Sequence, residues 1–247
     1  MIDLIRAEWI KVRSVRSYLW LVICALVLSY GLAALVTATV PLDGEVRANV
    51  IDRIDLALVG SQLSWMLLGV IGVLIVGQEY RFNTIRVTFA ASPVRYKVIA
   101  AKAVIVTAVG VVLGAISVAG SALIGGAILS SRGVPIDWTL SHANRIIPGS
   151  ILVGVLYALF GLAITCIVRQ PIGGILLITV YPLIIESIIG GLLSKVSKWL
   201  PFRAVSQIAS NARDGHHFGP SAGIAYFVLF LVALTVGGLV LVRRRDA

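Results

Sequence analysis

Six stretches of about 20 predominantly apolar residues constrain this chain more than any other feature. A helix needs about 20 such residues to cross the roughly 30 Å hydrocarbon core of a bilayer. Of the 247 residues, 59% are hydrophobic and only 13% are charged, a balance that is not typical of soluble domains. No series of segments alternates with the period of two that a transmembrane barrel requires. The sequence therefore predicts an all-α membrane protein, a single transmembrane domain over residues 1–247. The six predicted transmembrane helices are residues 19–40, 56–77, 103–129, 146–168, 171–193 and 222–242.

Lys and Arg are distributed unevenly between the two sides that this topology defines. Thirteen of the 21 fall on the side that holds both termini, and eight fall on the other side. Cytoplasmic segments of membrane proteins carry an excess of Lys and Arg, so we expect both termini to lie in the cytoplasm of a multi-pass plasma-membrane protein. The formal net charge of +10 follows this topology, which argues against nucleic acid as a partner and for contact with membrane lipid.

The N-terminal segment, residues 1–17, shows a helical pattern before the first transmembrane helix. Ile2, Ile5, Trp9 and Val12 recur at helical spacing among basic residues. This pattern predicts an amphipathic helix that lies at the membrane interface.

The first cytoplasmic loop, residues 78–97, has few charges for a free loop but is too polar to cross the membrane. Apolar side chains recur at helical spacing over residues 80–91, and Ser92 and Pro93 fit a turn after them. We expect a short interfacial helix over residues 80–91 on which another protein docks.

Searches for catalytic motifs return one formal match. Residues 219–223 fit G-x-S-x-G, with Ser221 in the nucleophile position and His216 and His217 upstream. Such a serine sits between a strand and a helix, whereas Ser221 opens a membrane helix, so we expect no catalytic residue. Asp214 and the two histidines could contact a metal, but a solvated loop explains them better, and we expect no metal site. No phosphate-binding loop is present in the sequence, so we expect no cofactor on this chain.

Glu186 is an acidic residue deep in an apolar segment. A carboxylate in the membrane is costly, and its presence is by default a sign of function. Pro182, four residues earlier, could break the helix and let Glu186 face water near the outer surface. Two possibilities stay open for Glu186: a structural or solvated role, or a proton or ion site in a self-contained secondary transporter or channel.

The first 102 residues contain a series of short motifs. After the basic segment Leu4–Ser17 come Glu79-Tyr80-Arg81, Asn83-Thr84-Ile85-Arg86, Ser92-Pro93-Val94-Arg95 and Ala101-Lys102. In this order they resemble the permease subunits of type-2 ABC exporters, particularly the short, actinobacterial-like kind. Leu4–Ser17 is similar to the basic interfacial helix with which these proteins begin, and the other four motifs are similar to their first cytoplasmic loop. Family members usually carry Gly where Asn83 stands, and Asn tolerates a left-handed backbone better than most residues.

The resemblance implies that the helix over residues 80–91 is a coupling helix seated in a groove of a separate ABC ATPase subunit. A second, smaller contact is implied at the tight turn of Arg169. The segment from Pro182 to Pro201 is implied to be an outer re-entrant hairpin that closes the exit path, which would place Glu186 in the substrate path. The residues implied at the main joint are Glu79, Tyr80, Arg81, Asn83, Thr84, Arg86 and Arg95.

The resemblance also implies an assembly and an activity. Two permease subunits, expected as a homodimer, would work with two ATPase subunits that bind ATP and Mg²⁺. ATP would drive export of a lipophilic or amphipathic substrate by alternating access. Drugs, peptide antibiotics and lipids are such substrates, so multidrug or antibiotic resistance is an implied role.

Overall fold

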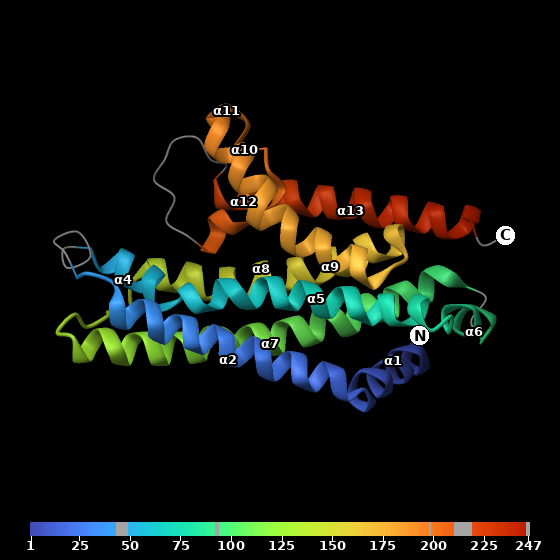
Figure 1. Ribbon diagram of the computed structural model, residues 1–247, viewed down its shortest axis with the longest axis horizontal. Coiled ribbons are helices and arrows are strands. Elements are labelled where there is room, and N and C mark those ends of the chain that lie inside the picture. The colour runs from blue at the N-terminus through green and yellow to red at the C-terminus, as the bar shows by residue number, and fades with distance from the viewer. Residues whose placement is uncertain (43–48, 92–93, 198, 210–218, 246–247) are drawn as a thin grey trace.

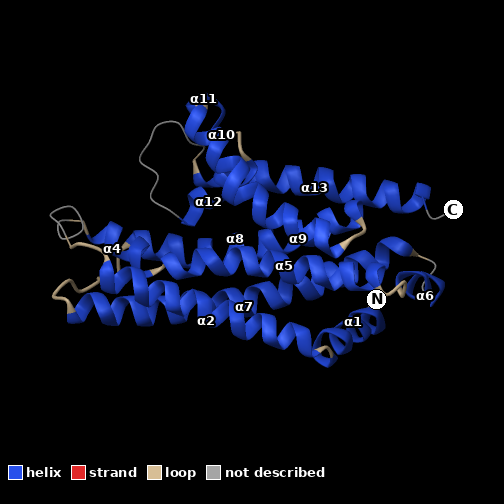
Figure 2. Ribbon diagram, in the orientation of Figure 1, coloured by secondary structure: helices blue, strands red, loops and turns tan. Residues whose placement is uncertain are grey.

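The computed structural model describes residues 1–42, 49–91, 94–197, 199–209 and 219–245, and these residues form helices and no strand (Figure 2). Six helical segments in this part of the chain are long and apolar enough to cross a membrane. They confirm the prediction of an all-α membrane protein with six spanning helices. The candidate spans are Arg16–Thr39, Val50–Arg81, Arg95–Ser131, Ser141–Val168, Pro171–Leu192 and Ser221–Val240.

The spans are built from α-helices of very different lengths. The first half of the chain forms α1 (Ile2–Ser14), α2 (Arg16–Thr39), α4 (Val50–Ala57), α5 (Val59–Arg81), α6 (Ile85–Ala91) and α7 (Arg95–Ser131). The second half forms α8 (Ser141–Val168), α9 (Pro171–Val180), the π-helical turn η1 (Tyr181–Ile185), α10 (Glu186–Leu192), α11 (Ser194–Ser197), α12 (Pro201–Ser206), η2 (Gln207–Ala209) and α13 (Pro220–Arg245).

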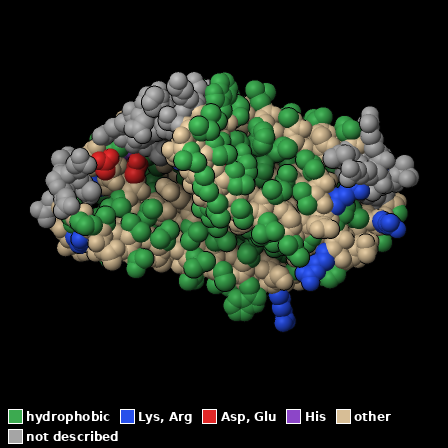
Figure 3. Space-filling view, turned by 45° about the horizontal axis from the view of Figure 1, so that its top comes forward, with side chains coloured by type: hydrophobic (Ala, Val, Ile, Leu, Met, Phe, Trp, Pro, Cys, Tyr) green, Lys and Arg blue, Asp and Glu red, His purple; other side chains and the backbone are tan. Residues whose placement is uncertain are grey.

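Both termini lie at the same end of the bundle, which also carries α1, α6 and the turn between α8 and α9 (Figure 1). We call this the terminal end. The opposite end, which we call the far end, carries α4 and the connection between α7 and α8. Lys and Arg side chains gather toward the terminal end in the face shown in Figure 3, whereas Asp and Glu appear toward the far end.

Helices α5 and α8 form the centre of the bundle and make its most extensive helix–helix contact. Glycines permit this close approach, because a Cβ atom at Gly72 would collide with the carbonyl oxygen of Ala158. A Cβ atom at Gly161 would likewise collide with the carbonyl oxygen of Gly69. Small residues at helix interfaces are typical of membrane proteins, in which close van der Waals packing replaces the hydrophobic effect between helices.

Helix α2 is joined to this centre by a buried polar contact. The Ser29 hydroxyl donates to the carbonyl oxygen of Gly60 at 2.8 Å and lies 2.9 Å from the Ser117 hydroxyl. One side chain thus links α2, α5 and α7 within the apolar interior. Hydroxyl contacts of this kind provide hydrogen-bond partners for polar groups, which lipid tails cannot do.

The fifth span does not end at Pro182. The chain passes through the π-helical turn η1, which contains Pro182, and continues directly into α10. The expectation that Pro182 could break the helix is therefore wrong, because widening to a π-helical turn accommodates the proline without ending the helix. The chain then reverses through α11 and α12, forming a hairpin that packs beside α8 and α13 (Figure 1).

Replacing Gly161 with Ala should destabilise the protein by about 1–3 kcal/mol, because the added methyl group must push α5 and α8 apart. Gly31 is a matched control, since an added Cβ there would have no neighbour within 4 Å. Gly31→Ala should be neutral or slightly stabilising, because Ala favours helices more than Gly. Thermal unfolding of the purified variants in detergent measures both effects, and equal shifts would contradict the proposed close packing.

Candidate functional site

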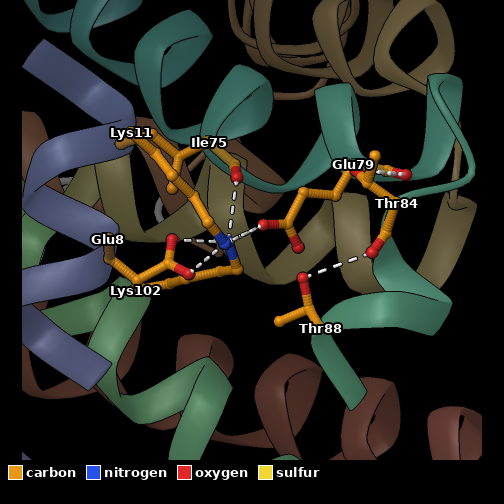
Figure 4. Close-up of polar contacts among 7 residues, drawn as sticks. All are labelled: Glu8, Lys11, Ile75, Glu79, Thr84, Thr88 and Lys102. Carbon is orange, nitrogen blue, oxygen red and sulfur yellow. Dashed lines mark hydrogen bonds and ion pairs between the residues drawn. The ribbon is translucent and has the colours of Figure 1, made fainter. Parts of the chain in front are cut away.

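Four charged side chains form a closed cluster at the terminal end, between α1, α5 and α7 (Figure 4). The Lys11 ammonium group lies 2.7 Å from Glu8 Oε1 and 2.7 Å from Glu79 Oε1. The Lys102 ammonium group lies 2.6 Å from Glu8 Oε2 and 2.9 Å from Glu79 Oε1. Each lysine therefore contacts both carboxylates. We call these four residues the ion-pair cluster.

The ion-pair cluster is largely sealed from solvent. Lys102 is 1% exposed, Glu8 and Glu79 are buried, and Lys11 remains half-exposed. Lys102 also donates to the carbonyl oxygen of Ile75 at 3.4 Å. Two positive and two negative groups cancel, and a buried charge is tolerated only when it is paired and hydrogen-bonded in this way. The cluster therefore ties the N-terminal helix to the ends of two spanning helices.

The charge state of Lys11 supports a persistent cluster. Partial burial alone would lower the pKa of Lys11, but its hydrogen bonds and attraction to Glu79 and Glu8 more than offset burial and raise the pKa above 10.5. Because the pKa of Lys11 is higher in the folded than in the unfolded protein, its ion pairs stabilise the fold fully when the pH is below the unfolded-state pKa. This contribution to stability is lost only as the pH rises through the folded-state pKa. Lys11 therefore stays protonated throughout the physiological pH range.

The link between α5 and α7 is a tight turn followed by the short helix α6. Helix α5 continues to Arg81, and Asn83 adopts a φ of 56°, the left-handed conformation. The Asn83 amide donates to the carbonyl oxygen of Tyr80, and α6 begins two residues later. The single helix predicted over residues 80–91 is therefore wrong in its first five residues, because α5 ends at Arg81 and the left-handed Asn83 precedes the start of α6 at Ile85.

The turn and α6 present apolar and basic groups at the surface. Phe82 is 66% exposed and Val87 is 69% exposed. The Arg81 guanidinium lies 5.5 Å from the centroid of the Phe82 ring, and Arg86 is exposed on α6. An exposed apolar patch with basic groups beside it is typical of a surface that binds another protein.

Two residues predicted in separate contacts lie together. Arg169 adopts a φ of 60° and ends α8, while Pro171 begins α9. The Arg169 guanidinium lies 6.0 Å from the centroid of the Tyr80 ring on α5. The turn between α8 and α9 is therefore joined to the end of α5 by a cation–π contact.

A groove of about 670 Å³ lies between α1 and the α5–α6 corner. Leu4 and Val12 line it from α1, and Phe82 and Val87 line it from the opposite wall. Thr84 and three members of the ion-pair cluster, Glu8, Lys11 and Glu79, also line it, so the groove is mostly apolar with charges along one side.

The remaining residues of the predicted joint divide into exposed and buried groups. Asn83 and Thr84 are exposed beside α6, and Arg95 is partly buried at the start of α7. Glu79 is different, because its carboxylate is held within the ion-pair cluster. Within this chain Glu79 is an internal link between helices, and its contact with a partner stays a prediction.

Glu8 and Lys102 belong to the cluster but were not singled out as site residues by sequence reasoning. Lys102 enters the sequence interpretation through the charge distribution and the Ala101-Lys102 motif, and the helical pattern of residues 1–17 emphasises the apolar side of that segment. In the structure Glu8 is buried, whereas Ile2 and Trp9 are exposed. The available signal was Glu8, three positions before Lys11 in a helix that carries more basic than acidic residues.

Glu186 lies at the start of α10, away from α6 (Figure 1), and its side chain is held by contacts within the protein. Its carboxylate is buried and accepts hydrogen bonds from the backbone amides of Phe202 at 3.0 Å and Arg203 at 2.9 Å. The Phe202 ring then packs against Tyr157 and Phe160, with centroids 4.7 and 4.9 Å apart. Glu186 thus fixes the returning arm of the hairpin, and it does not face water as one expectation had it.

The other candidate groups do not form a site in the described part of the chain. Ser221 lies exposed in the first turn of α13, and residues Asp214, His216 and His217 lie outside the described residues. Among the residues that are described, no group of three or more His, Cys, Asp or Glu could hold a metal ion.

Comparison with known proteins gives one family. A family model described as "ABC-2 family transporter protein" matches residues 4–197, which include the ion-pair cluster, α6 and Glu186. No curated protein and no solved structure matches the chain significantly.

Replacing Lys102 with Met should destabilise the protein by about 3–5 kcal/mol, because Glu8 and Glu79 would lose a buried partner. Lys97→Met is the matched control on the same helix, since Lys97 is exposed and should tolerate the change. Adding Glu79→Gln to Lys102→Met should recover part of the loss. Thermal unfolding measures all three variants, and a Lys102→Met variant as stable as Lys97→Met would exclude the role of the cluster.

Replacing Glu186 with Gln should destabilise the hairpin by about 1–3 kcal/mol, because an amide cannot accept both backbone hydrogen bonds as well as a carboxylate can. Ser187→Ala, at the exposed neighbouring position, should change little. Limited proteolysis between α10 and α13 reports the loosening. A normally folded Glu186→Gln protein that has lost all transport would instead favour an ion site.

Proposed function

Because this chain belongs to the ABC-2 family of transporter proteins, we propose that it is the permease subunit of an ATP-driven exporter. Membership of the family makes the chain a multi-pass membrane component of an ABC transporter. The proposal adds the direction of transport, the way in which ATP hydrolysis is coupled, and the composition of the assembly.

The exposed corner formed by Phe82 and α6 is the observation that carries the proposal. It protrudes at the terminal end between two spanning helices and presents apolar and basic groups (Figure 1). We propose that α6 is the coupling helix and that it sits in a groove of an ABC ATPase subunit. Arg81, Arg86 and Arg95 would supply polar contacts, and Arg169 would supply a second, smaller contact.

The ion-pair cluster supports a route by which movement of α6 reaches the membrane. Helix α6 is connected directly to α5 and α7, and the cluster binds both of these helices to α1. A displacement of α6 would therefore move three helices as a unit, because separating them would expose paired buried charges. A packed network of paired charges can carry such a displacement from one element to the next.

We propose that ATP and Mg²⁺ bind to the partner and that this chain binds neither. Two ATPase subunits would work with two permease subunits, and the permease pair would be a homodimer. The family supports the ATPase partner, while the copy numbers follow from the general architecture of such exporters. Closure of the ATPase pair on ATP would move the coupling helices and open a route outward.

The distribution of charge supports a cytoplasmic position for the terminal end. Lys and Arg gather at this end in Figure 3, and cytoplasmic segments are enriched in these residues. Both termini would then lie in the cytoplasm, and α6 would face the compartment that holds ATP. The hairpin that Glu186 fixes would lie toward the outer side, where it could close the exit path.

The cargo that fits best is lipophilic or amphipathic. The spans are strongly apolar, and the polar groups described within them are largely hydrogen-bonded among themselves. Such surfaces suit a drug, a peptide antibiotic or a lipid, consistent with a role in resistance.

Affinity purification of the tagged protein from native membranes should recover an ABC ATPase in stoichiometric amount. The double variant Arg86→Glu/Val87→Asp should lose this partner and its ATPase activity, because it places acidic groups on the exposed surface of α6. Asp137→Arg is the control, since Asp137 is exposed at the far end and its charge reversal should leave the partner bound.

Thermal unfolding should show that the α6 variant folds as the wild type does. Recovery of the wild-type protein without any ATPase, even after gentle crosslinking, would contradict the proposal. Equal recovery of the ATPase with the α6 variant would move the docking surface elsewhere.

A further inference from the structure

A second groove lies at the bend between α1 and α2 and does not belong to the surface assigned to the ATPase. It has a volume of about 390 Å³. Arg13 and Arg16 lie on its wall, one on each side of Val15, whose extended backbone separates the two helices. Leu19 from α2 and Val112 from α7 contribute apolar walls. We call this the elbow groove.

The two arginines bring unpaired positive charge to the elbow groove. Both are exposed, and neither has a hydrogen bond or ion pair with the described residues. Glu8 and Glu79, the buried acidic groups at this end, are already bound by Lys11 and Lys102. The positive charge of Arg13 and Arg16 therefore suits an anionic group from outside the chain.

The other walls of the groove are apolar and continue onto the surface of the bundle. Leu19 is 61% exposed and Val112 is 56% exposed, and Ile116 extends the exposed apolar surface one turn further along α7. These residues lie within candidate spans, so the groove runs from basic groups at the start of α2 onto membrane-facing surface. Trp9, which also lines the groove, is of a type enriched at membrane interfaces.

We propose that the elbow groove binds an anionic phospholipid. The lipid phosphate would lie between Arg13 and Arg16, where guanidinium groups can donate paired hydrogen bonds to its oxygens. The upper part of one acyl chain would follow Leu19 and Val112 and continue along α7. A volume of about 390 Å³ suits a headgroup and the first part of a chain, because the rest of the lipid stays in the bilayer.

This occupant fits better than a second copy of the chain. A protein interface over the groove would bury Arg13 and Arg16, and unpaired buried charges are strongly unfavourable. An anionic lipid places its negative charge at the depth at which the chain enters the membrane. Its acyl chain then points into the bilayer, along the exposed apolar side chains of α2 and α7. Basic groups next to a membrane helix attract anionic lipid in this way. The proposal does not rest on the ATPase partner or on the direction of transport.

The test is native mass spectrometry of the full-length protein released from nanodiscs that contain equal amounts of phosphatidylglycerol and phosphatidylcholine. The wild type should retain phosphatidylglycerol in preference to phosphatidylcholine. Arg13→Gln/Arg16→Gln should lower phosphatidylglycerol affinity roughly fivefold for each arginine, or about 25-fold together. Arg6→Gln/Lys97→Gln removes the same charge from exposed positions outside the groove and should leave retention unchanged.

A second variant, Val112→Trp, fills the apolar wall but keeps both arginines, and it should also reduce retention of phosphatidylglycerol. Equal retention of the two lipids by the wild type would overturn the proposal, as would full retention by the double arginine variant. Disulfide crosslinking between copies through Leu19→Cys, with Cys24 and Cys166 replaced, would show instead that a second copy covers the groove.

Discussion

The close approach of α5 and α8 is the contact on which the rest of the bundle depends. Within lipid, apolar side chains gain little by leaving one apolar environment for another, so helices associate where their surfaces fit closely. Gly72 and Gly161 let backbone meet backbone, and larger side chains would keep the two helices apart. The other spans pack around this pair, and the buried polar contacts of Ser29, Lys102 and Glu186 act on helices that this pair has already positioned.

Polar groups in this protein act mainly as links between elements that are distant in the chain. The ion-pair cluster joins residues up to 94 positions apart, and Glu186 holds backbone amides 16 and 17 positions further on. Each link pairs its charges or donors within the protein, which is the condition for placing them in an apolar environment, although Glu79 Oε2 is buried with no hydrogen-bond partner among the described residues. The same links make α1 and the returning arm of the hairpin parts of the folded bundle, although neither is long enough to cross a membrane.

The sequence was sufficient to predict the class and number of the spanning helices, because length and apolarity alone decide whether a helix can cross lipid. Asn83 was also informative, since the left-handed conformation restricts residue type and occurs there. The partners of Glu79 and Glu186 could not be predicted, because they come from segments whose register against each other is set by packing. Glu79 was therefore assigned to the surface, and Glu8 and Lys102 were not assigned to the site. The bend at Val15 likewise defines the elbow groove only once α7 is seen beside it.

Helix α7 has a length that bears on how the bundle could work mechanically. Its 37 residues extend about 55 Å, well beyond the roughly 30 Å of hydrocarbon, so its ends lie among the headgroups or in water. Lys102 lies in the third turn of this helix, toward the end that begins at Arg95. A change of only about 5° in its tilt about its midpoint would displace each tip by about 2.4 Å, given the same rise per residue. A small rotation of α7 within the bilayer would therefore be coupled to ångström-scale movement at the end of α7 that follows α6.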